Sequence, residues 1–221
     1  MINAAVFDLD GLIFNTEDVF IEATSRFLRP FGYDYHPEVQ RRMMGQQASV
    51  STAILKEYYS LDESIDEIRH RIEEHFIQVL PEILGLMPGF PELIAFITEE
   101  RIPSAVCTSS TSDYATELLR RFDFLDCFEF ILGGELVENG KPAPDCYQMA
   151  CKRIGFSPEE VVVFEDSENG CRAAVDAGTI AIAVPGVHNA GHTYSGAALI
   201  ADTLKDQRIY ELLRKLRKIE K

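Results

Sequence analysis

Residues 15–87 carry only a helical pattern of apolar and polar positions. Apolar side chains recur every three or four residues over 17–31 and again over 65–79, a spacing that places them on one face of a helix. No strand pattern interrupts this stretch, and Pro81 and Pro88 are expected to end it. Four helices are therefore predicted, and their start signals are Thr16, Pro37, Ser49 and the capping box of Ser64 with Glu67.

The rest of the chain alternates short apolar runs with helical segments, such as one from about Ser112 to Phe122. This alternation is typical of a parallel sheet with crossover helices. We therefore predict an α/β protein with a Rossmann-like parallel sheet core, made of residues 1–14 and 88–221, and an inserted α-helical domain of residues 15–87. The expected strands are Ala4–Phe7, Ala105–Cys107, Phe130–Leu132 and Val161–Phe164.

Two carboxylates follow the first apolar run. Asp8 and Asp10 lie two positions apart at its end, and Gly11 comes next. Alternate positions on a strand project to the same side, so the two carboxylates can share one cation. Taken alone, an ordinary acidic turn before a glycine has the same pattern.

Hydroxyls and a single cation follow the next two runs. Thr108, Ser109 and Ser110 lie where a helix begins, and the unpaired backbone donors of such a junction bind anions. The stretch from Thr108 to Ser112 could instead cap the helix. Lys141 lies in a loop whose shape is fixed by prolines, either as a positioned charge or as a solvated loop lysine.

Acidic residues also follow the fourth run. The oxygens of Glu165 and Asp166 are the ligands that hard cations prefer, although the pair could equally form an acidic turn or cap. All four motifs nevertheless follow the C-terminal ends of predicted parallel strands, where open α/β sheets place their sites. Their occurrence in this order favours one site that holds both a cation and an anion.

Together these segments resemble the four motifs of the haloacid dehalogenase superfamily, in the branch with a helical cap inserted after the first strand. The resemblance extends from Asp8 to about Gly186. Within that branch the chain is similar to sugar-phosphate phosphatases and β-phosphoglucomutases. The resemblance implies that Asp8 is the nucleophile and that Mg²⁺ is bound by Asp8, Asp166 and the backbone carbonyl of Asp10. Glu165 is expected to take part in the metal site without binding the ion directly.

The same resemblance implies the remaining roles. Asp10 is expected to act first as a general acid and then as a general base, which requires it to begin protonated. Thr108 and Lys141 are expected to hold the transferring phosphoryl oxygens, together with backbone N–H groups near Gly11 and Ser109. Two substrate contacts are expected from the cap, Gly45 and Gln46.

The cap favours a phosphatase over a mutase. Mutases of this family carry a histidine where this chain has Phe20, and an arginine three positions after a cap glycine, where residues 45–48 read Gly-Gln-Gln-Ala. Glu17 resembles the phosphatase pattern. We expect magnesium-dependent hydrolysis of a small phosphorylated metabolite, a sugar or sugar-acid phosphate. A β-phosphoglucomutase-like mutase is the alternative, and a non-catalytic phosphate-binding protein is a third hypothesis.

Several polar residues outside the four motifs carry weaker signals. Asn15 stands where the family usually has an acid, and its amide is expected to cap a helix or hydrogen-bond the hinge and to alter closure, not chemistry. Arg41 and Arg42 either face the substrate or lie on a solvated helix face. His188 and His192 are four residues apart among glycines, which indicates a loop, and they receive no role.

Composition limits the partners and the compartment. The chain of 221 residues has a formal charge of −15, which disfavours nucleic acid and anionic membranes as partners. An anionic substrate therefore needs local positive charge, from Mg²⁺, Lys141 or helix N-termini. No signal-peptide or membrane-spanning pattern follows Met1, so a cytoplasmic protein is expected. The five cysteines are expected to be reduced, mostly buried thiols. The oligomeric state stays open, and a monomer is compatible with the sequence.

Overall fold

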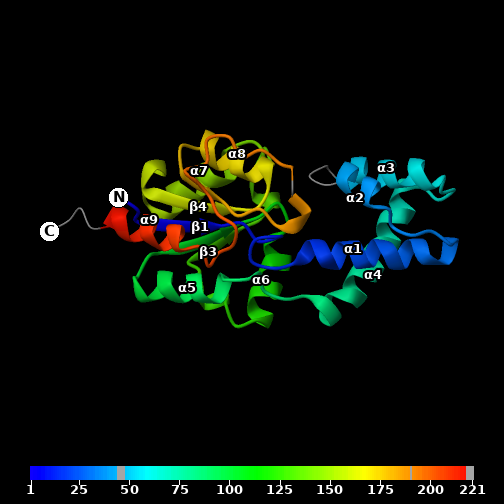
Figure 1. Cartoon of the computed structure of the whole chain (residues 1–221), viewed down its shortest axis with the longest axis horizontal. Helices are drawn as coiled ribbons and strands as arrows, with labels where there is room; N and C mark the ends of the chain where they lie inside the picture. Colours follow the sequence, from blue (N-terminus) through cyan, green and yellow to red (C-terminus); the bar gives the residue numbers. More distant parts are fainter. Residues whose placement is uncertain (44–47, 190, 218–221) are drawn as a thin grey trace. The chain divides into compact units, whose positions relative to one another are not determined.

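The computed structural model describes residues 1–43, 48–189 and 191–217, which form two compact units. The first unit comprises Met1–Phe14 and Leu86–Lys221 and is an α/β domain; the second comprises Asn15–Gly85 and is helical. In the first unit, helices lie on both sides of the strands: α7 and α8 on one side, α5 and α6 on the other (Figure 1).

One parallel sheet of six strands organises the first unit. Its spatial order is β3-β2-β1-β4-β5-β6, so the chain moves outward in one direction from β1 and in the other from β4. Val6 of β1 is in register with Ala105 of β2 and Val163 of β4. The ends of β1 and β4 therefore lie at the topological switch point, where α/β sheets bind ligands. The strands are β1 (Ala4–Phe7), β2 (Ser104–Cys107), β3 (Phe130–Leu132), β4 (Val161–Glu165), β5 (Ile180–Ala183) and β6 (Leu199–Ile200).

Both faces of the sheet are covered by apolar side chains, which is why its central strands read as continuous apolar runs. Val6 and Cys107 pack into a cluster with Tyr147 of α7. On the opposite face Phe7 stacks on Phe164 with ring centroids 4.8 Å apart and meets the edges of further aromatic rings. The helices are α5 (Phe90–Glu99), α6 (Ser112–Arg121), α7 (Asp145–Ile154), α8 (Glu168–Asp176) and α9 (Gln207–Arg217). The predicted Rossmann-like α/β fold is confirmed.

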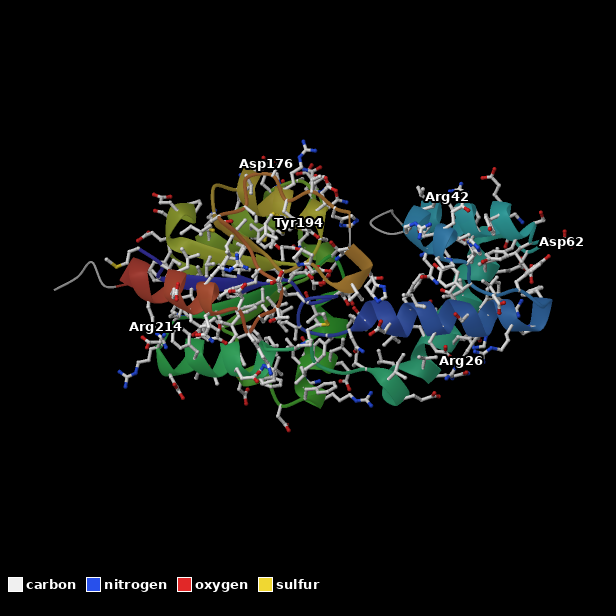
Figure 2. The ribbon with its side chains drawn as sticks, in the orientation of Figure 1. Arg26, Arg42, Asp62, Asp176, Tyr194 and Arg214 are labelled. Carbon is white, nitrogen blue, oxygen red and sulfur yellow. The ribbon has the colours of Figure 1, made fainter. Side chains whose placement is uncertain are left out.

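In its described residues, the second unit consists of four α-helices and one short 3₁₀ helix. Their apolar stripes meet in a cluster of its own that includes Phe27, Leu55 and Ile68. Arg26 of α1, labelled in Figure 2, forms an ion pair with Glu82 of α4. The helices are α1 (Thr16–Leu28), α2 (Pro37–Met43), α3 (Ala48–Tyr59) and α4 (Ile65–Ile83).

The capping box of Ser64 with Glu67 is confirmed, but two other cap predictions are wrong. The first helix already includes Thr16, and the third includes Ser49, so neither residue precedes its helix. The expected stop at Pro81 is also wrong. Proline removes one N–H donor but does not prevent the last turn from continuing, and α4 extends to Ile83.

Hydrogen bonds join the first and last residues of the helical unit, near residues 15 and 85. Within the helical unit, Oδ1 of Asn15 accepts a bond from the backbone N–H of Gly85 at 2.6 Å, and its Nδ2 donates to the carbonyl of Ile83 at 3.3 Å. The predicted hinge hydrogen bond of Asn15 is thus confirmed. Within the described residues its side chain does not cap α1.

All five cysteines are free thiols, and four of them are buried. Among the described ranges, no helix is long and apolar enough to cross a membrane. Short 3₁₀ helices occupy Arg29–Phe31, Leu125–Cys127, Gly134–Leu136, Pro158–Glu160 and Val187–Asn189.

Candidate active site

The end of β1 carries Asp8 and Asp10, which have different surroundings. Asp8 is buried, and its Oδ1 accepts a hydrogen bond from Nζ of Lys141 at 2.5 Å. Asp10 is half-buried, and its Oδ2 accepts bonds from the hydroxyls of Thr108 at 3.1 Å and Ser110 at 2.8 Å. The first carboxylate is therefore paired with a charge and the second with neutral hydroxyls from the end of β2.

The end of β4 carries Glu165 and Asp166. Glu165 is completely buried, and its Oε1 accepts from Lys141 at 2.6 Å and from the phenol of Tyr147, while its Oε2 accepts from Oγ of Ser167 at 3.2 Å. Asp166 is 4% exposed, and its Oδ2 accepts from Nδ2 of Asn189 at 2.7 Å. Both oxygens of Glu165 are thus engaged by protein donors.

Lys141 links the two strand ends. Its ammonium binds Asp8, Glu165 and the backbone carbonyl of Cys107, and its side chain is 7% exposed. Burial alone lowers the pKa of this ammonium, but Asp8 and Glu165 outweigh burial and hold the pKa well above its usual range. Lys141 is therefore a fixed positive charge and not the solvated loop lysine that the sequence left open.

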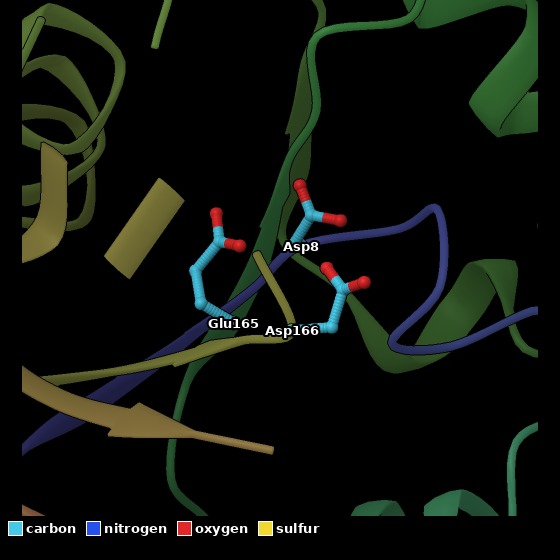
Figure 3. Close-up of side chains that lie close together, drawn as sticks. All are labelled: Asp8, Glu165 and Asp166. Atoms are coloured by element: carbon cyan, nitrogen blue, oxygen red, sulfur yellow. The ribbon is translucent and has the colours of Figure 1, made fainter. Parts of the chain in front are cut away.

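The carboxylates fit a divalent cation. Among the described residues, Asp8, Glu165 and Asp166 each place one oxygen within 4.8 Å of the others, and all three side chains extend from neighbouring strand ends (Figure 3). With all three carboxylates ionised, the single ammonium of Lys141 would leave a formal charge of −2 in this buried group. Because burying an uncompensated charge is costly, a divalent cation is the natural counter-charge. Such a cation also favours the ionised form of Asp8, whose pKa burial raises to about 8 although Lys141 lowers it.

Two glycines leave the space in which these carboxylates lie. A Cβ at Gly11 would be 2.3 Å from Oδ2 of Asp166, and Gly11 has a φ of +80°, which disfavours any larger residue. A Cβ at Gly170 would be 1.9 Å from Oε1 of Glu165. Gly11 thus allows the loop after β1 to approach the acid after β4, a structural role that the sequence alone did not indicate.

A small pocket adjoins the carboxylates within the α/β unit. Its volume is about 140 Å³, and Thr108, Ser109 and Lys141, all predicted phosphate contacts, contribute to its lining with Gly134, Gly140, Val137 and Cys146. Hydroxyl, backbone N–H and ammonium groups in one pocket can bind a phosphoryl group.

The N-terminus of α6 contributes less to this pocket than expected. The backbone N–H of Ser112 donates to the carboxylate of Glu135, and that of Tyr114 donates to the hydroxyl of Thr111. These donors, which the sequence suggested for anion binding, are therefore already occupied. Within the stretch from Thr108 to Ser112, the residue that caps the helix is Thr111, and Thr108 is left to line the pocket.

The structure adds two polar residues that the sequence analysis missed, Tyr147 and Asn189, each of which donates to one of the four acids. Ser110, predicted as an anion-binding hydroxyl, donates to Asp10. Gly45 and Gln46, the expected cap contacts, lie outside the described residues. Arg41 and Arg42 are exposed on α2, as on a solvated face. His188 and His192 lie in the turn and loop after β5, as the sequence indicated.

Known proteins resemble the chain over most of its length. Residues 5–184 match the family model of haloacid dehalogenase-like hydrolases. A phosphorylated carbohydrates phosphatase of Thermotoga maritima is 37% identical over 175 residues, which cover 79% of this chain and 81% of the relative. A probable pseudouridine-5'-phosphatase of Drosophila melanogaster is 32% identical over 210 residues, which cover 91% of this chain and 89% of the relative.

A solved structure shares the fold. It is the crystal structure of a Thermotoga maritima protein provisionally described as a beta-phosphoglucomutase, with 32% identity and a TM-score of 0.82. The alignment covers 97% of this chain and all of that one. The likeness therefore includes both the α/β unit and the helical unit.

Proposed function

We propose that this chain, which belongs to the haloacid dehalogenase-like hydrolases, is a magnesium-dependent phosphatase that acts through an aspartyl-phosphate intermediate. The chain is a phosphoric monoester hydrolase. The proposed substrate is a small phosphorylated metabolite, a sugar or sugar-acid phosphate. Its relative from Thermotoga maritima, named for phosphorylated carbohydrates, supports that substrate class.

One observation carries this proposal. The carboxylates of Asp8 and Asp166 lie together at the switch point of the sheet, and a buried lysine and a small hydroxyl-lined pocket lie beside them. A binding protein for phosphate needs the pocket and the lysine. It has no use for a buried cluster of acids that repels phosphate, so this cluster supports catalysis.

In the first step, a carboxylate oxygen of Asp8 attacks the phosphorus atom. A bond from Asp8 to phosphorus forms, the ester P–O bond breaks, and its electron pair leaves with the alcohol oxygen. The ammonium of Lys141 fixes the orientation of Asp8 and, with the hydroxyl of Thr108 and the backbone N–H of Ser109, binds the phosphoryl oxygens.

Asp10 moves the proton in both steps. It gives a proton to the departing alcohol oxygen and later removes one from the water that attacks the phosphorus, which breaks the bond to Asp8 and restores its carboxylate. The hydroxyl of Ser110 keeps the side chain of Asp10 in place, and the hydroxyl of Thr108, which also donates to Asp10 in this structure, turns to the phosphoryl group when substrate binds.

Mg²⁺ would be held by Asp8, Asp166 and the backbone carbonyl of Asp10. When bound, it offsets the repulsion between the phosphate dianion and the attacking carboxylate. Glu165 acts through Lys141, since the protein itself engages both of its oxygens. The helical unit 15–85 is the proposed cap, which selects the alcohol part of the substrate and excludes water.

A phosphosugar mutase is the second candidate, because one structural relative is provisionally described as a beta-phosphoglucomutase. A mutase must hold a second phosphate group. Phe20 replaces the histidine expected of mutases, and residues 45–48 lack the expected arginine. These replacements favour hydrolysis.

Phosphate release from a panel of sugar, polyol and nucleotide monophosphates tests the proposal. We expect the parent to release phosphate with Mg²⁺, to stop when a chelator removes the metal, and to resume when Mg²⁺ is restored. Asp8→Asn should lower turnover by at least about 10⁴-fold, as loss of a nucleophile does. Interconversion of glucose phosphates without phosphate release would favour the mutase. Full turnover by Asp8→Asn would exclude the covalent mechanism.

A further inference from the structure

Asn189 gives both hydrogens of its side-chain amide to a single residue. It is 5% exposed and ends the 3₁₀ turn Val187–Asn189 that follows β5. Its Nδ2 donates to Oδ2 of Asp166 at 2.7 Å and to the backbone carbonyl of Asp166 at 3.0 Å. One amide therefore fixes the carboxylate of Asp166 relative to its own main chain.

The loop that carries Asn189 is itself fixed. The backbone N–H of Asn189 donates to the carbonyl of Gly186, and its carbonyl accepts from the N–H of His192. Tyr194, in the same loop (Figure 2), donates its hydroxyl to the backbone carbonyl of Asp166 at 2.7 Å. Asn189 and Tyr194 therefore both donate to the main-chain carbonyl of Asp166. Of these two side chains, Asn189 is the one that also donates to the carboxylate of Asp166.

The opposite side of the carboxylate is also limited. Gly11 approaches so closely that a Cβ at this position would lie 2.3 Å from Oδ2 of Asp166. The carboxylate thus lies between Gly11 and the amide of Asn189. An amide is neutral, so it orients Asp166 without cancelling the negative charge that a cation needs. The ammonium of Lys141, in contrast, places a positive charge against Asp8.

We propose that Asn189 is a positioning residue for the cation, which holds Asp166 in the orientation required to bind Mg²⁺. This inference rests on the proposed function, in which Asp166 is a metal ligand. Hydrogen-bonded partners that orient metal ligands commonly change metal affinity when they are removed.

The test is calorimetric titration of the full-length protein with Mg²⁺. Asn189→Leu keeps the branched shape of the side chain, although it is larger, and has no donor, and Asn189→Ala removes the donor without adding bulk. Both should weaken Mg²⁺ binding by about 10- to 100-fold. Tyr194→Phe, the matched control, loses a bond to the main chain of Asp166 but none to its carboxylate, and it should bind Mg²⁺ nearly as the parent does. Thermal unfolding shows that each variant is folded.

A second readout separates positioning from general damage. The Asn189 variants should need more Mg²⁺ for half-maximal phosphate release, and saturating Mg²⁺ should return most of their turnover. Either folded Asn189 variant binding Mg²⁺ within about twofold of the parent would overturn the inference, since that falls well below the usual effect. So would equal losses in Tyr194→Phe and Asn189→Leu, because loop anchoring would then explain both. If the parent itself binds no Mg²⁺, the proposed magnesium dependence fails first.

Discussion

The ends of β1 and β4 both carry pairs of acids, yet the partners of these acids differ. After β1, Asp8 faces an ammonium and Asp10 faces two hydroxyls. After β4, Glu165 faces the same ammonium and a phenol, whereas Asp166 faces a neutral amide. Residue type alone makes the four acids equivalent. Their donors distinguish them.

This difference explains the proposed division of labour. Glu165 is fully buried with both oxygens bound by protein donors, so it serves to hold Lys141. Asp166 receives a neutral donor and keeps its charge, which suits a cation ligand. Asp8 lies between these two environments, against the lysine and close to Asp166, as a nucleophile with a nearby metal should.

Asp166→Asn, a change at the end of β4, is expected to have the largest effect on Mg²⁺ binding. The variant loses the charge that the proposed metal site depends on, so Mg²⁺ binding should weaken by more than about 100-fold. This loss exceeds the typical effect of removing a residue that hydrogen-bonds a metal ligand. Turnover should fall at all accessible Mg²⁺ concentrations. Titration of parent and variant with Mg²⁺ measures this, and unchanged affinity would remove Asp166 from the metal site.

Glu165→Gln should show that the two acids after β4, Glu165 and Asp166, have different roles. A glutamine keeps the shape but weakens the hold on Lys141, so we expect a loss of about 1–3 kcal/mol in the free energy of unfolding. Turnover should fall while Mg²⁺ affinity changes far less than in Asp166→Asn.

Tyr147→Phe is the matched control for Glu165→Gln. It removes one donor to Glu165 and leaves the ion pair with Lys141 intact. Chemical denaturation together with Mg²⁺ titration measures both variants. A loss of Mg²⁺ affinity in Glu165→Gln as large as that in Asp166→Asn would make Glu165 a direct ligand and erase the distinction.

Ser110→Ala, which removes a hydrogen bond to Asp10 at the end of β1, is expected to have the smallest effect on turnover. Asp10 would lose its bond at 2.8 Å but keep the bond from Thr108. Turnover should fall by about tenfold or less, since one hydrogen bond between neutral groups contributes about 0.5–1.5 kcal/mol. Mg²⁺ affinity should stay at the value of the parent. Steady-state kinetics and a Mg²⁺ titration check this, and a larger loss of metal binding than of turnover would argue against a role confined to Asp10.

The sequence predicted the α/β fold and the acids because their signals are local. Each motif follows an apolar strand, and parallel strands bring their C-terminal ends to one edge of a sheet. The partners of the acids carry no such signal. Asn189 contacts Asp166 only because the loop after β5 folds back onto it, and the hydroxyl of Tyr147 meets Glu165 only through the packing of α7 on the sheet.

Helix boundaries were less predictable than helices. The apolar spacing predicted α1 and α4, but Thr16 and Ser49 lie inside helices because a hydroxyl residue near a start can be either the cap or the first turn. The elements after Gly186 had no motif to mark them. β6 has two residues, and among the described side chains the apolar stripe of α9 includes Ile209 and Leu213.

Covalent phosphorylation of Asp8 is the central claim, and acid-quenched peptide mass spectrometry tests it most directly. The parent is mixed with Mg²⁺ and a hydrolysed substrate, quenched in acid within a turnover and digested. We predict one added phosphoryl group on the peptide that contains Asp8, and none in Asp8→Asn. Rapid phosphate release with no phosphorylated Asp8 peptide at any quench time, or a phosphoryl group on another residue, would contradict the account.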